Sequence, residues 1–328
     1  MADDGWLDQP FELAGKRIFV AGASGMVGAA AARRLKSGHC ELLTPSHAAL
    51  DLTRQADVES WMAANKPDVV VLAAAKVGGI AANSAYPADF LYENMMIEAN
   101  VIHAAYKSGV EKLLFLGSSC IYPREAEQPI KPEALLSGSL EPTNEAYAVA
   151  KIAGLKLCEA YRKQEGCDFI SAMPCNLYGP GDTYDEQNSH VIPALLMRAV
   201  KAKKDGAEEL VIWGTGAPLR EFLYVDDLAD GLIFLLKHYS GLSHVNIGSG
   251  EEVSIKALAV LICELVGYEG ALVFDETKPD GTPKKVIDSS VMTGRGWRPK
   301  LSLSVGLQHT LENFNSTFET SRIGFCKN

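Results

Sequence analysis

The chain has 328 residues, of which 47% are hydrophobic, and its 41 acidic and 31 basic side chains give a net charge of −10. A chain of this length can bury one large core or two smaller ones. The negative charge argues against nucleic acid as a partner, because phosphate binding needs a positive field, and no apolar run is long enough for a membrane span.

The cysteines and the first residues bear on the cellular compartment. Seven cysteines are scattered without CxxC pairs, which disfavours both a disulfide framework and a zinc site. Residues 1–4 are Met-Ala-Asp-Asp and lack the basic and apolar regions of a secretory signal. The sequence therefore predicts a cytoplasmic protein without a bound metal ion.

The first predicted unit is a strand, a glycine loop and a helix. The apolar run 17–21 is followed at once by Gly22-Ala23-Ser24-Gly25-Met26-Val27-Gly28 and an Ala-rich helix through Leu35. In GxxGxxG loops of this kind the first two glycines let the backbone approach a pyrophosphate, and the third permits close helix–strand packing. We therefore assign Gly22, Ser24, Gly25, Met26, Val27 and Gly28 to a dinucleotide site.

Strand and helix patterns then alternate to residue 173. Strands are predicted over 41–44, 69–73, 112–116 and 169–173, and helices over 57–65, 89–108 and from Tyr147 onward. This alternation predicts an α/β fold with a Rossmann-like, doubly wound parallel sheet and ligands at the carboxyl ends of its strands.

After residue 175 the pattern indicates a smaller, interleaved α/β substrate domain. The predicted elements are a turn-rich exit over 176–181, a helix containing Arg198, a strand over 210–213, a helix opened by 220–226 and running to 237, a strand over 245–247, a helix over 255–266, a strand over 272–274 and a polar loop over 278–285. We assign 14–175 and 221–248 to the dinucleotide-binding domain, 176–220 and 249–318 to the substrate-binding domain, and 1–13 and 319–328 to tails.

The loop after the second strand bears on cofactor choice. NAD-selective folds usually place a carboxylate there for the ribose 2′-hydroxyl, but this loop reads Thr44-Pro45-Ser46-His47. We therefore predict NADP(H), with Ser46 or His47 near the 2′-phosphate. Asp51 either accepts a hydrogen bond from the adenine amino group or caps a helix. The predicted cofactor site further includes Leu52, Ala73, Ala74, Tyr147, Lys151, Pro174, Asn176, Leu177 and His190.

Tyr147 and Lys151 lie four residues apart, so in a helix they share one face. An ammonium about 5 Å from a phenol oxygen favours the phenolate by roughly 3 kcal/mol at an effective dielectric of about 20. Such a tyrosine can exchange a proton with a carbinol oxygen while a hydride moves, and the hydroxyl of Ser118, just past the fourth strand, can hold that oxygen. The same YxxxK spacing also occurs in ordinary amphipathic helices.

Taken together, these motifs resemble the extended short-chain dehydrogenases/reductases. Longer segments resemble the GDP-L-fucose synthase family over residues 16 to about 315, namely 72–79, 86–90, 117–123, 141–145, 188–193, 220–226 and 278–283. The resemblance implies that C3 and C5 of GDP-4-keto-6-deoxy-D-mannose are epimerised and that the C4 ketone is then reduced with NADPH.

The resemblance also implies residue roles. Tyr147 would be the acid for reduction, Lys151 would bind the nicotinamide ribose and lower the pKa of the tyrosine, and Ser118 would hold the keto oxygen. Epimerisation needs a base on one face of the sugar and an acid on the other, and the family's cysteine and histidine fall on Cys120 and His190. The implied substrate residues are Ser119, Asn176, Arg198, Trp213, Arg220 and Lys285.

Within this assignment, Arg198 and Trp213 would face the nucleotide, and Arg220 and Lys285 would supply charge for the diphosphate or sugar. Lys284 is a further candidate cation, although any one of these cations is also typical of an ordinary surface. Bacterial relatives often have arginines at the positions of Ser24 and of the loop at Ser46, so their absence here weakens the prediction of an NADP preference.

Four alternative functions compete with this assignment. A 4,6-dehydratase needs a carboxylic acid beside the serine, and Ser119 and Cys120, which stand there in this chain, cannot supply one. A nucleotide-sugar 4-epimerase/4-reductase would leave Cys120 and His190 idle. The same chemistry on a GDP-4-keto-6-deoxy-heptose fits the motifs equally, and a non-catalytic regulator would be expected to lack the Tyr147–Lys151 pair.

The predicted helix 147–162 is apolar on nearly all sides. A helix with two apolar faces must bury both. One face would meet the sheet, and we assign the other to a second copy of the chain, pairing with helix 89–108 in a two-fold homodimer. Burial under the chain's own loops is the alternative.

Overall fold

The computed structural model describes residues 4–185, 189–278 and 280–324. Asn188 and Pro279, which belong to two of the motifs quoted above, lie outside the described residues, as do the ends of both predicted tails. Among the described residues, no helix combines the length and the apolar character that a membrane span needs.

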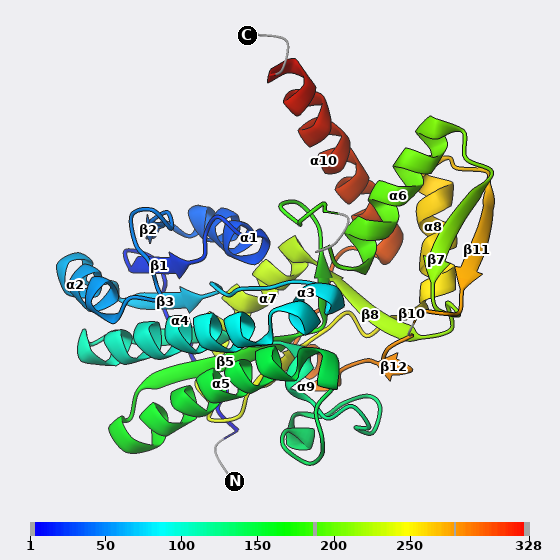
Figure 1. The fold of residues 1–328 in the computed structure, drawn as a ribbon. Coiled ribbons are helices and arrows are strands. Elements are labelled where there is room, and N and C mark those ends of the chain that lie inside the picture. The colour runs from blue at the N-terminus through cyan, green and yellow to red at the C-terminus, as the bar shows by residue number, and fades with distance from the viewer. Residues whose placement is uncertain (1–3, 186–188, 279, 325–328) are drawn as a thin grey trace.

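A parallel sheet of six strands in the order β2-β1-β3-β4-β5-β9 forms the centre of the molecule (Figure 1). Its strands are β1 Arg17–Ala21, β2 Glu41–Leu43, β3 Val69–Leu72, β4 Lys112–Leu116, β5 Asp168–Pro174 and β9 Val245–Ile247. Every residue of β3 and β4 is buried, because helices cover both faces of a parallel sheet. The predicted doubly wound α/β fold is therefore confirmed.

The helices around this sheet form two layers. Their bounds are α1 Met26–Leu35, α2 Gln55–Asn65, α3 Ile80–Ala85, α4 Pro87–Lys107, α5 Glu145–Glu165 and α7 Val225–His238. Helices α1 and α7 pack together in one layer, and α2, α4 and α5 in the other. The short helix α3 was not predicted.

Most of the remaining elements form a smaller α/β region at one end of the sheet (Figure 1). They are β6 Asn176–Tyr178, α6 Val191–Asp205, β7 Glu209–Trp213, β8 Leu219–Tyr224, β10 Glu252–Ser254, α8 Ile255–Val266, β11 Ala271–Asp275, β12 Lys284–Lys285 and α10 Leu303–Gly324. The short helix α9, Ser290–Gly294, contacts β9 of the central sheet instead. Strand β8 pairs with β6, β10 and β12, while β7 pairs with β11.

Three local predictions are wrong, and β8 accounts for all of them. Residues 220–224 form part of this strand, and the helix predicted to open at Arg220 begins only at Val225. Residues 176–178, predicted as part of a turn-rich exit, form a strand parallel to β8, and two residues of the predicted polar loop form β12 beside it. Pairing with distant segments decides the structure here, because strand propensity depends on neighbouring strands.

Buried side chains form two main clusters. The larger one surrounds the six-stranded sheet, and the smaller one lies among α6, α8, β7 and β8. Ile287, Met292 and Trp297, which the sequence places in the substrate domain, belong to the larger cluster. The division into two domains remains a prediction.

Candidate active site

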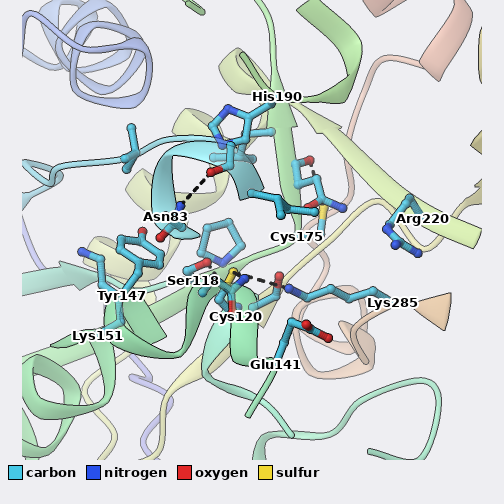
Figure 2. A pocket seen from close by; sticks show the side chains of 18 of the residues that line it. Asn83, Ser118, Cys120, Glu141, Tyr147, Lys151, Cys175, His190, Arg220 and Lys285 are labelled. Atoms are coloured by element: carbon cyan, nitrogen blue, oxygen red, sulfur yellow. Dashed lines mark hydrogen bonds between the residues drawn. The ribbon is translucent and has the colours of Figure 1, made fainter. Parts of the chain in front are cut away.

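A cavity of about 790 Å³ opens where the carboxyl ends of the central strands face the smaller region. It contains sixteen of the predicted site residues, which come from both regions of the chain: Gly25, Met26, Val27, Gly28, Ala73, Ser118, Ser119, Cys120, Tyr147, Lys151, Pro174, Asn176, Leu177, His190, Arg220 and Lys285. Figure 2 shows the labelled side chains arranged around this space.

Other predicted residues do not line the cavity: Gly22, Ser24, Ser46, Asp51, Leu52, Ala74, Arg198 and Trp213. Asp51 does not cap α2, because the residue at that position is Arg54. Its Oδ1 instead accepts hydrogen bonds from the backbone N–H and the hydroxyl of Thr53, at 3.0 and 2.7 Å. The alternative contact of Asp51 with adenine remains a prediction.

The glycines of the loop let its backbone pack closely against α1 and Ala74. A Cβ on Gly28 would lie 2.1 Å from the carbonyl oxygen of Gly22, and Gly22 has φ +86° with Ala74 against it. Helix α1 follows directly, with Gly25 as an N-cap that offers no capping side chain. Its first N–H groups are therefore available to an anion, and these residues fit the diphosphate of a nicotinamide dinucleotide.

Ser118 and Tyr147 meet at the end of β4. The hydroxyl of Ser118 accepts a hydrogen bond from the N–H of Cys120 at 3.2 Å, which fixes the start of a short 3-10 turn. The ring of Tyr147 rests edge-on against Phe90, with centroids 6.4 Å apart. The serine and the phenol are thereby held on one wall of the cavity.

The pKa of Tyr147 is raised well above its usual range, mainly by burial. The nearby Cys120 and Glu98 add to this rise, and a hydrogen bond with Ser118 acts against it. The lowering of this pKa that we expect from Lys151 does not outweigh the effect of burial and remains a prediction. The phenol therefore stays protonated at neutral pH, which is the form that a general acid needs.

The ammonium of Lys151 contacts a backbone carbonyl and a buried carboxylate. Its Nζ donates to the carbonyl oxygen of Leu116 at 3.1 Å and lies 3.0 Å from Oε1 of Glu98. It also lies 5.9 Å from the centre of the Tyr147 ring. The lysine is thus fixed beside the phenol, and its charge is shared with a buried carboxylate.

Cys120 and His190 approach the cavity from different elements. Figure 2 shows Cys120 and His190 on opposite sides of the labelled group. The sulfur of Cys120 accepts from the Nδ2 of Asn144 at 3.3 Å and from the Nζ of Lys285 at 3.5 Å. His190 is the N-cap of α6, and burial lowers its pKa. The lowered pKa favours the neutral imidazole, which can accept a proton.

Positive charge gathers in this cavity although the whole chain is acidic. Arg220, Lys284 and Lys285 line it together with Lys151. Burial lowers the pKa of Arg220, and Asp280 and Glu141 act against this effect. An anionic substrate would therefore meet a local positive field.

The two predicted nucleotide-facing residues lie together outside the cavity. The guanidinium of Arg198 lies 5.8 Å from the ring of Trp213, and the ammonium of Lys278 lies 5.6 Å from the same ring. The Nη1 of Arg198 also donates to the carbonyl oxygen of Val211 at 3.1 Å. These residues form an aromatic platform with two cations.

Sequence reasoning missed several polar residues at the site. Asn144 and Glu141 belong to the segment 141–145, whose match to a family motif was a usable signal. Glu98 and Asp182 belong to no motif quoted above, and each is recognised only because folding buries it beside a predicted catalytic side chain.

The chain is similar to known proteins over most of its length. The sequence model of a family described as "NAD dependent epimerase/dehydratase family" matches residues 18–248. The chain is 62% identical to GDP-L-fucose synthase 1 of Arabidopsis thaliana over 297 residues, which cover 90% of this chain and 92% of the relative.

Solved structures are also similar. A GDP-L-fucose synthetase from Naegleria fowleri bound to NADP has a TM-score of 0.87 and 28% identity, covering 96% of this chain and 99% of that one. A GDP-6-OMe-4-keto-L-xylo-heptose reductase from C. jejuni has a TM-score of 0.86 and 35% identity, covering 92% of this chain and 98% of that one.

Proposed function

Because the chain belongs to the NAD dependent epimerase/dehydratase family, we propose that it catalyses the GDP-L-fucose synthase reaction. In this reaction C3 and C5 of GDP-4-keto-6-deoxy-D-mannose are epimerised, and the C4 ketone is then reduced to give GDP-L-fucose. The observation that carries the proposal is that a thiol, an imidazole and a protonated phenol, those of Cys120, His190 and Tyr147, line one cavity. The relative from Arabidopsis thaliana supports the same reaction by its name.

Epimerisation uses the two faces of the sugar. One member of the pair Cys120 and His190 removes the proton alpha to the ketone, and the other returns a proton to the opposite face. The phenol of Tyr147 and the hydroxyl of Ser118 donate hydrogen bonds to the enolate oxygen between these two steps. Proton exchange with water then returns the thiol and the imidazole to their starting forms, and the same cycle at the second carbon completes the double inversion.

Reduction of the C4 ketone uses the wall of the cavity that holds Ser118 and Tyr147. When bound, NADPH supplies the hydride for C4. Tyr147 gives its proton to the C4 oxygen as the ketone becomes an alcohol, and the phenolate that remains is stabilised by the ammonium of Lys151. The cations Arg220 and Lys285 hold the charged part of the substrate.

We propose NADP(H) in preference to NAD(H). The loop after β2 has no carboxylate, and such a group would repel a 2′-phosphate. Ser46 and His47 are the proposed neighbours of that phosphate. The NADP bound to the similar protein from Naegleria fowleri supports this choice.

We also propose a homodimer that forms through α4 and α5. One face of α5 is buried in the chain, whereas Val149, Ala153 and Ala160 on the other side are exposed. Tyr92, Met95 and Ala99 on α4 are exposed as well. Apolar side chains on two helices that pack together provide a continuous surface for a second copy.

A second candidate substrate is a GDP-4-keto-6-deoxy-heptose. The similarity to the heptose reductase from C. jejuni supports it. Supplying each keto sugar to the protein with NADPH and comparing kcat/KM separates the two candidates.

Product analysis in deuterated buffer tests the main proposal. GDP-4-keto-6-deoxy-D-mannose and NADPH should give GDP-L-fucose with deuterium at C3 and C5, as seen by NMR, and the nicotinamide absorbance should fall in step. Reduction without deuterium at either carbon would exclude the double epimerisation. Absence of NADPH oxidation by folded protein would leave the non-catalytic regulator as the explanation.

A further inference from the structure

A buried carboxylate lies directly beside the lysine of the site. The side chains of Glu98 and Lys151 are 1% and 3% exposed, and Oε1 of Glu98 lies 3.0 Å from Nζ of Lys151. Within the described part of the chain, Lys151 is the one ion-pair partner of Glu98. The carbonyl oxygen of Leu116 accepts from the same ammonium at 3.1 Å. Two fixed groups from α4 and β4 therefore hold a lysine of α5.

Helix α5 leaves room for this carboxylate at Gly154. A Cβ at this position would lie 2.4 Å from Oε2 of Glu98 and 2.7 Å from Cζ of Phe115. Glycine inside a helix costs about 1 kcal/mol relative to alanine. Glycine is nevertheless found at this position, one turn after Lys151, where any side chain would push Glu98 out of place.

Stability alone does not explain such a pair. Burial raises the pKa of Glu98, and the charge of Lys151 acts against this rise. The desolvation of two buried charges generally offsets most of their attraction, so apolar residues would stabilise the same place at least as well. A buried ion pair has value where one charged group must be held in a defined position.

We propose that Glu98 is the positioning residue of Lys151, and that it holds the ammonium where the nicotinamide ribose binds. The inference deepens the proposed function, because it concerns how that site holds its cofactor. Glu98 does not line the cavity and acts only through Lys151. Its loss should therefore weaken cofactor binding before it affects the two groups that invert the sugar carbons.

The first experiment measures the Kd of NADPH by fluorescence titration, without sugar. We expect Glu98→Gln, which keeps the shape of the side chain, to raise the Kd about tenfold. The control is Asp168→Asn, because Asp168 pairs with the buried Lys112 at 2.6 Å and neither residue lines the cavity. This control should lower the Tm and leave the Kd unchanged. An unchanged Kd in Glu98→Gln would overturn the inference.

The second experiment asks whether Glu98 acts through Lys151. In a Lys151→Met background, the further change Glu98→Gln should leave the Kd of NADPH unaltered, because the group to be positioned is gone. A further tenfold loss in that background would show that Glu98 acts independently, and the inference would fail. If Glu98→Gln does not fold, Glu98→Asp shortens the carboxylate by one methylene and serves in both experiments.

Catalysis gives a separate readout. In Glu98→Gln the KM for NADPH should rise and the rate of NADPH oxidation should fall about tenfold, while deuterium exchange at C3 and C5 falls less. Equal losses in both reactions would indicate a general structural defect and contradict the inference. A wild-type protein that binds NADPH but makes no GDP-L-fucose would refute the proposed function and leave the binding experiments valid.

Discussion

Oδ1 of Asp182 lies 4.0 Å from Nδ1 of His190. Burial raises the pKa of Asp182 from 3.8 to about 6 and lowers that of His190. Each group is therefore biased toward its neutral form, although the two could form an ion pair. This arrangement has a measurable effect on stability as the pH changes.

The native chain holds the proton of Asp182 more tightly than the unfolded chain does. Its contribution to stability is therefore full below pH 3.8 and is lost as the pH rises through about 6. Asp182→Asn carries no such proton, so between pH 4 and pH 7 it should gain up to about 3 kcal/mol of unfolding free energy relative to the wild type. Urea unfolding of both proteins at several pH values measures this difference. A difference that does not change with pH would contradict the prediction.

Tyr147→Phe should remove the acid for reduction. The ring keeps its contact with Phe90, so the fold should persist, while NADPH oxidation should fall at least about 100-fold. The nicotinamide absorbance measures this rate. The control is Tyr268→Phe, which removes the hydroxyl of another buried tyrosine, one that donates to the carbonyl oxygen of Ala207 at 3.1 Å and does not line the cavity. The control should lose stability and keep most of the activity, and equal losses in the two variants would remove Tyr147 from the acid role.

Cys120→Ser and His190→Asn should each block deuterium exchange from solvent into the sugar, because the inversion needs a proton acceptor and a proton donor on opposite faces. Both variants should still bind NADPH, and Cys120→Ser should bind it with an unchanged Kd. Cys40→Ser is the matched control, since Cys40 does not line the cavity. NMR of the sugar in deuterated buffer measures exchange at C3 and C5. Exchange at the wild-type rate in both variants would refute the assignment of the pair.

Ser46→Glu should reduce the preference of the enzyme for NADPH over NADH. A carboxylate in the loop after β2 would repel a 2′-phosphate and accept from a 2′-hydroxyl. The ratio of kcat/KM with NADPH to kcat/KM with NADH should fall at least about tenfold. Ser46→Gln has a similar size without the charge and should change the ratio less. If both variants keep the wild-type ratio, the 2′-phosphate does not lie near Ser46.

Local patterns predicted the parts of the fold that depend on near neighbours in the sequence. The apolar strands β1, β3 and β4 and the helix α8, predicted with its observed bounds, carry their own periodicity. The motif residues Ser118, Tyr147 and Lys151 lie close together because the turn that follows β4 packs against α5.

Contacts between distant segments were not predictable in this way. The strand β8 depends on three partners that lie elsewhere in the chain. Glu98 gains its significance only because α4 packs on α5, and Asp182 only because its loop returns to His190. Trp6, for which the sequence predicted only a tail, packs against Tyr239 with ring centroids 5.0 Å apart. Each of these relations belongs to tertiary packing, which no local pattern of residue types encodes.

Val149→Glu should break the proposed homodimer. The side chain of Val149 on α5 is 41% exposed in the single chain, and that of Met95 on α4 is 43% exposed. A carboxylate buried between two copies without a partner would cost several kcal/mol, so light scattering at micromolar concentration should change from a dimer mass to a monomer mass. Val260→Glu on α8 is the matched control, because this valine is 39% exposed and lies outside α4 and α5. A monomeric wild type would exclude the dimer, and a dimer that survives Val149→Glu would place the interface on another face.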